Sequence, residues 1–139
     1  MKGLRITAIL YGLAIAAHTA DHFRRGIDAI TPEVFWSGIA ATVLAAVAIG
    51  LALAANRYAA PVAAFVGLTH AIGIAAVHLL PRWSAFSDAF PGNGVAPISW
   101  VVVSLEIVAS LAFGIAGVRA LSSGPRGETV LPARRDVRC

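Results

Sequence analysis

Four histidines and one glutamate are the residues of this chain best suited to chemistry. His18 and His22 lie four positions apart. His70 and His78 follow in a later apolar run, and Glu106 interrupts the last such run. Ionisable side chains are expensive inside a membrane, so they face a bundle interior or a cavity and mark candidate functional sites. We predict a shared site formed by His18, His70 and Glu106, with His22 and His78 as further members.

The chemistry that this set would support is metal binding. Two imidazoles and a carboxylate are a suitable ligand set for zinc, or for non-haem iron with open coordination positions. Haem b is an alternative, held by one histidine from the first apolar run and one from the third. Covalent c-type haem is excluded, because no C-x-x-C-H motif exists.

Other polar residues fall on the same helical faces as these candidates. Asp21 is three positions from His18, and Tyr11 lies two turns away on the same stripe. Asp21 also has the spacing to pair with Arg24 and Arg25 on its own helix. The residues predicted to support the site from behind are Tyr11, Asp21, Ser99 and Ser110.

The elements that must position these residues are long apolar runs. Hydrophobic residues make up 58% of the 139 residues and charged residues only 13%, whereas soluble domains have about 25% charged residues. About 20 apolar residues span a bilayer as a helix, and runs of that length without alternation exclude barrel strands. We therefore predict an all-α, polytopic membrane protein, an antiparallel four-helix bundle with spans at residues 6–23, 33–55, 58–80 and 98–120.

The candidate residues all fall in one half of the predicted membrane. At 1.5 Å per residue, His18 lies about 8 Å from the outer face, Glu106 about 12 Å and His70 about 15 Å. His22 and His78 lie closer to the same face. The predicted compartment is therefore polar and opens outward.

The connection between the third and fourth spans contains an aromatic pattern. Trp83, Phe86 and Phe90 have the spacing i, i+3, i+7 and lie between Pro81 and Pro91. This pattern predicts a short interfacial amphipathic helix. Such a helix would serve either as a lid over the polar compartment or as an ordinary membrane anchor.

The distribution of basic residues predicts the orientation. Of the 11 Lys and Arg residues, eight fall on the side of the two termini and three on the other, which favours cytoplasmic termini in the plasma membrane. Residues 1–121 form the predicted membrane domain, and residues 122–139 a disordered basic cytoplasmic tail. The first run also resembles a signal peptide, which would be cleaved near residue 16.

Three functions are compatible with these features. The first is metal or haem binding at the outward-facing site, for redox chemistry or metal handling. The second is an accessory or assembly subunit of a larger membrane complex, in which the polar residues only lock helix packing. The third is an enzyme that acts on a lipid or isoprenoid by His/Glu acid–base chemistry. The expected partners are the bilayer and a second copy or larger complex, and no nucleic-acid motif is present.

Overall fold

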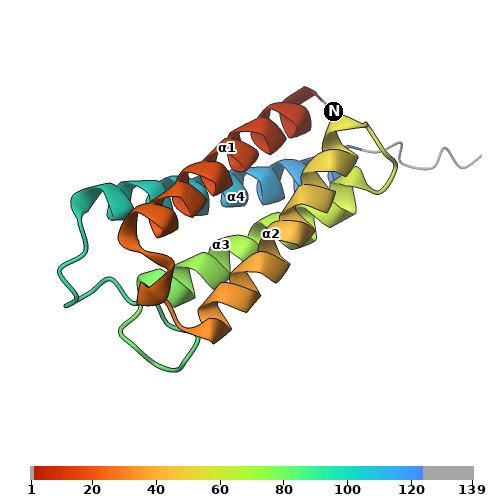
Figure 1. Cartoon of the computed structure of the whole chain (residues 1–139). Helices are drawn as coiled ribbons and strands as arrows, with labels where there is room; N and C mark the ends of the chain where they lie inside the picture. Colours follow the sequence, from red (N-terminus) through yellow and green to blue (C-terminus); the bar gives the residue numbers. More distant parts are fainter. Residues whose placement is uncertain (1, 124–139) are drawn as a thin grey trace, which may run out of the picture.

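The computed structural model describes residues 2–123, which form four long helices and one short 3-10 helix (Figure 1). Each long helix is long and apolar enough to cross a membrane, which confirms the all-α fold class and identifies a multi-pass membrane protein. The elements are α1 (Lys2–Arg25), η1 (Ile27–Ala29), α2 (Pro32–Leu53), α3 (Ala59–His78) and α4 (Pro97–Ser122).

Local sequence signals explain where these helices begin. The Thr31 side chain accepts a hydrogen bond from the backbone N of Val34 and caps α2, whose first residue is Pro32. Pro97 is likewise the first residue of α4, which has no side-chain cap. Between α2 and α3 the chain reverses sharply, with Ala55 at a φ of 53° and Asn56 accepting a hydrogen bond from the backbone N of Tyr58.

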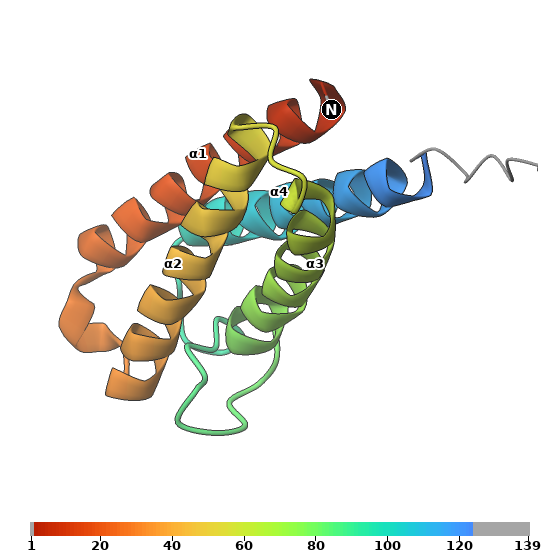
Figure 2. The ribbon, with the colours of Figure 1, turned by 90° about the vertical axis from the view of Figure 1, so that its right-hand side faces the viewer.

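The four helices pack in chain order around a ring, and α4 closes the ring against α1 (Figures 1 and 2). The α3–α4 pair is the closest, because glycines bring the two backbones together. A Cβ atom added at Gly67 would lie 2.5 Å from the backbone N of Gly114, and one at Gly117 would lie 2.5 Å from the backbone N of Ala64. Small residues at such crossings are typical of membrane helix packing.

Large apolar side chains cover the outside of the bundle. Examples are Leu13, Phe65 and Ile72, each more than 60% exposed. The apolar core that is sealed from the outside lies towards the end of the bundle where α1 starts, around Tyr11 and Phe113. Outward-facing apolar residues around a small core are the arrangement expected when lipid surrounds the helices.

The predicted interfacial helix in the third connection is wrong. Residues 79–96 contain only turns, bends and irregular chain, and two of their backbone N–H groups bond back to the end of α3. The N of Asp88 donates to the carbonyl of Val77 at 3.1 Å, and the N of Phe90 donates to that of His78 at 2.9 Å. Ser87 Oγ accepts hydrogen bonds from the backbone N of Trp83 and of Ser84, which holds the turn.

Most of the predicted tail, residues 124–139, lies outside the described residues. The helix α4 runs to Ser122, the first residue assigned to that tail. The tail's disorder and cytoplasmic location therefore stay predictions, as does cleavage of a signal peptide near residue 16.

Candidate metal centre

Three histidines gather at the end of the bundle where α1 and α3 end. His18 and His22 come from one face of α1, and His78 is the last residue of α3. One ring nitrogen from each of them lies within 4.8 Å of the other two. In a tetrahedral zinc site with Zn–N bonds of about 2.0–2.1 Å, nitrogens lie about 3.3 Å apart. Small side-chain movements would therefore bring this group, the His cluster, to ligand distance.

The hydrogen bonds of two of these rings leave a nitrogen lone pair available. His18 Nδ1 is bonded to Glu106 Oε2, so in the neutral ring facing an ionised carboxylate Nδ1 carries the hydrogen and Nε2 the lone pair. That Nε2 atom is buried and has no hydrogen-bond partner among residues 2–123. His78 Nδ1 lies 3.1 Å from the carbonyl oxygen of Asp88. Oxygen acceptors behind the ring are the usual support of a metal-bound histidine.

A hydrogen-bonded chain runs from the His cluster towards the middle of the bundle. Glu106 contacts His18 through Oε2, and its Oε1 lies 3.2 Å from His70 Nε2. The other nitrogen of His70 is bonded to the hydroxyl of Tyr11. Glu106 is only 2% exposed and Tyr11 is fully buried. This chain gives a buried carboxylate the partners that burial requires.

The predicted set of His18, His70 and Glu106 therefore does meet in space, in a different arrangement from the one expected. Both nitrogens of His70 are occupied by other side chains, and Glu106 lies between two imidazoles. Direct metal ligation by His70 or Glu106 stays a prediction, and the geometry favours His22 and His78 as the companions of His18.

The remaining supporting residues bond to groups other than the histidines. Ser110 Oγ donates to the backbone carbonyl of Glu106 at 2.7 Å, so it bonds its own helix and not the carboxylate. Asp21 accepts from Arg24 Nε at 2.8 Å, and Ser99 Oγ accepts from Arg24 at 2.9 Å. Asp21 and Ser99 therefore form a polar group centred on Arg24.

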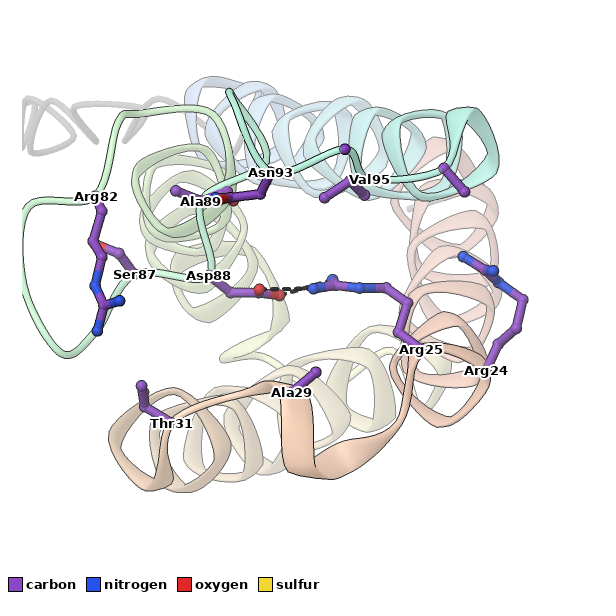
Figure 3. Close-up of a pocket in the computed structure, with 12 residues that line it drawn as sticks. Arg24, Arg25, Ala29, Thr31, Arg82, Ser87, Asp88, Ala89, Asn93 and Val95 are labelled. Atoms are coloured by element: carbon purple, nitrogen blue, oxygen red, sulfur yellow. Dashed lines mark hydrogen bonds and ion pairs between the residues drawn. The ribbon is translucent and has the colours of Figure 1, made fainter.

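An ion pair that the sequence did not predict crosses the mouth of the bundle. Arg25 donates two hydrogen bonds to Asp88, at 2.8 and 2.7 Å (Figure 3). Asp21 was the expected partner of Arg25, but Asp88 in the third connection takes that place. Burial raises the pKa of Asp88, yet the hydrogen bonds and charge of Arg25 outweigh it, so the pKa lies below its ordinary value. Asp88 is therefore a carboxylate that anchors Arg25 while its backbone contacts His78.

A polar vestibule of about 440 Å³ opens at this ion pair. Its lining includes Arg24, Arg25 and Arg82 together with Asp88 and Asn93 (Figure 3). The vestibule lies at the same end of the bundle as the His cluster. Asp88 links the two, because its carboxylate lines the vestibule and its carbonyl contacts His78.

A comparison of the chain with models of protein families, with curated proteins and with solved structures finds no match in any of the three. The geometry of the His cluster therefore carries the functional argument.

Proposed function

We propose that this membrane protein binds a transition-metal ion through His18, His22 and His78. The observation that carries the proposal is the Nε2 atom of His18, which is buried without a hydrogen-bond partner among residues 2–123 and belongs to a group of three clustered histidines. Leaving a buried polar atom unsatisfied costs about 1–3 kcal/mol, and a bound ion would remove that cost. Zinc and ferrous iron both accept imidazole ligands.

The surroundings of the cluster support this proposal. Glu106 and the Asp88 carbonyl stand behind His18 and His78, where they orient each ring and make it a better ligand. Three protein ligands leave a fourth position for water or another molecule, which is the pattern of catalytic zinc sites. A site of this type suits metal-dependent chemistry or metal handling better than a purely structural role.

An ion fits this geometry better than haem b. Two axial imidazoles must stand on opposite faces of the macrocycle. The His18 and His78 rings are 4.9 Å apart between centroids and meet edge to face. The His22 and His78 rings, the other pair in the His cluster that joins α1 to α3, are 5.8 Å apart between centroids. Neither pair leaves room for a porphyrin between its rings.

Zinc retention by purified protein tests the proposal. Protein in nanodiscs is loaded with zinc, passed over a desalting column and analysed by elemental analysis. We expect stoichiometric zinc in the wild type and in His70→Asn, and loss of zinc in His22→Asn and His78→Asn. Size-exclusion profiles check that each variant is folded.

Two results would contradict the proposal. Wild-type protein that retains no zinc and no iron would favour an accessory subunit, in which the polar residues only lock helix packing. Loss of metal in His70→Asn with retention of metal in His22→Asn would indicate that the ligands are His18, His70 and Glu106, as the sequence predicts.

The proposed location is the plasma membrane, with both termini in the cytoplasm and the His cluster towards the outside. The excess of basic residues on the side of the termini supports this orientation. Alkaline phosphatase fused to the C-terminus is then expected to be inactive, and the same enzyme inserted after Gly92 to be active. The reverse pattern would place the His cluster on the cytoplasmic side.

A further inference from the structure

A cleft of about 570 Å³ lies beside the His cluster, between α1, α2 and α3. Its volume is in the range of small-molecule sites, about 300–1,000 Å³. The cleft exists because α2 packs closely at one end only. Three of the four buried residues of α2 lie in the second half of that helix, namely Ala45, Ala48 and Ala52. The cleft runs along the first half of α2, from Val34 to Leu44.

The walls and the floor of this cleft differ in chemistry. The walls are hydrocarbon over most of their area, and they include Ile15, Ile39, Leu44, Phe65, Ile74 and Val77. The floor is the part of the lining formed by all four histidines of the chain and Glu106. These ionisable side chains lie together, in the His cluster and in the hydrogen-bonded chain of Glu106. A ligand that matches both parts is an amphiphile with a hydrocarbon chain and a polar head.

The proposed metal ion decides which head group is favoured. Three neutral imidazoles leave a divalent ion with its full positive charge, and Glu106 is already shared between His18 and His70. An uncompensated charge in a low-dielectric site is costly, so an anionic fourth ligand is favoured. Because His18, His22 and His78 all line the cleft, that ligand can approach from the cleft. Carboxylate oxygen is a normal ligand of zinc and iron.

Resting on the proposed metal site, we infer that the cleft binds a long-chain carboxylic acid. Its carboxylate occupies the fourth position of the ion, and its hydrocarbon chain lies along the first half of α2 and the facing side of α3. Such a ligand enters from the surrounding lipid, in which its chain is already dissolved. Its carboxylate therefore does not have to cross the closed apolar core around Tyr11.

Saturation binding of radiolabelled palmitate tests this inference. The protein is used full length, loaded with zinc in nanodiscs, and zinc content is measured on the same samples. We expect one saturable palmitate site per chain. Removing zinc with a chelator, or replacing palmitate by the uncharged palmityl alcohol, is expected to weaken binding by about tenfold or more.

Two glycines provide a matched pair of variants. A Cβ atom added at Gly73 or at Gly50 would meet nothing within 4 Å. Gly73 lines the cleft and Gly50 does not. Gly73→Leu is therefore expected to abolish saturable palmitate binding while zinc is retained, which also shows that the variant is folded. Gly50→Leu is expected to bind both zinc and palmitate as the wild type does.

The outcomes separate this inference from the metal site. Stoichiometric zinc without saturable palmitate binding overturns the inference and leaves the metal site standing. Equal palmitate binding with and without zinc, or in Gly73→Leu and Gly50→Leu, overturns the placement of the head group or of the chain. Absence of zinc from the wild type overturns both proposals.

Discussion

The Nδ1 atom of His18 is hydrogen-bonded to the Glu106 carboxylate, while the Nε2 atom of the same ring is buried without a partner among residues 2–123. The two residues are 88 positions apart and lie on neighbouring helices, α1 and α4. An ionised carboxylate only accepts hydrogen bonds, so Glu106 holds His18 in the tautomer that directs a lone pair into the His cluster. This contact joins a buried acid to a candidate metal ligand.

Glu106→Gln tests the orienting role of the carboxylate. The amide keeps the shape of the side chain, but it removes the charge that stabilises a metal-bound imidazole. Zinc affinity is expected to fall about 10–100-fold, measured by competition with a chelator. The exposed Glu33 at the start of α2 offers the control, and Glu33→Gln is expected to keep wild-type affinity. Equal affinities in the two variants would show that Glu106 does not act on the metal site.

Tyr11→Phe tests the other end of the hydrogen-bonded chain. The change removes the hydroxyl that contacts His70 Nδ1 and leaves the ring packing against Phe113 in place. The free energy of unfolding is expected to fall by about 0.5–2 kcal/mol, measured by denaturant unfolding in detergent micelles, with zinc affinity unchanged. A loss of zinc affinity as large as that of Glu106→Gln would place the His70 branch in the ligand set.

Asp88→Asn tests the ion pair across the mouth of the bundle. The pKa of Asp88 is lowered in the folded protein, so its contribution to stability is present above the ordinary Asp pKa of about 3.9 and is lost as the pH falls through the lower, folded value. At pH 7 we expect Asp88→Asn to lower the free energy of unfolding by about 1–3 kcal/mol. In acid, where Asp88 of the wild type becomes protonated, the difference in stability between the variant and the wild type is expected to be smaller. Asp28→Asn, at an exposed position of η1, is expected to leave thermal stability unchanged at both pH values. A difference that persists in acid would contradict this explanation.

Gly67→Ala tests the close approach of α3 and α4. The added methyl group would meet the Gly114 backbone at 2.5 Å, so the helices must separate at a cost of about 1–3 kcal/mol. Gly73→Ala on the same helix meets no atom within 4 Å and gains about 0.5–1 kcal/mol of helix propensity. Thermal unfolding of the two variants should therefore shift in opposite directions. A stable Gly67→Ala variant would show that the two backbones are not in contact.

The helices could be predicted because the length and hydropathy of an apolar run are read directly from the sequence, and these two properties indicate a membrane-spanning helix. The shared face of His18 and His22 follows equally directly from the helical period. The helical period does not determine how one helix is rotated about its axis relative to its neighbours. Spacing along α3 does not tell whether His70 or His78 reaches His18, and the structure places His70 with Glu106 and Tyr11 but His78 in the His cluster.

The third connection was harder to predict because no period describes it. Its aromatic spacing suggested a helix, but Ser87 Oγ and the end of α3 take the backbone hydrogen bonds that a helix would need. The contacts of Asp88 with Arg25 and His78 could therefore not be predicted from the sequence. Long-range pairs of this kind depend on how a loop folds back, which composition and spacing do not encode.

X-ray absorption spectroscopy at the zinc edge of zinc-loaded protein tests the central claim most directly. The proposal predicts three imidazole nitrogens at about 2.0–2.1 Å, with one further light ligand. In His70→Asn the imidazole count should stay at three, whereas His78→Asn, which is expected to lose its zinc, should give no zinc-edge signal after desalting. A spectrum with one imidazole or none in the wild type, or a count that changes with His70 and not with His78, would contradict a metal centre formed by His18, His22 and His78.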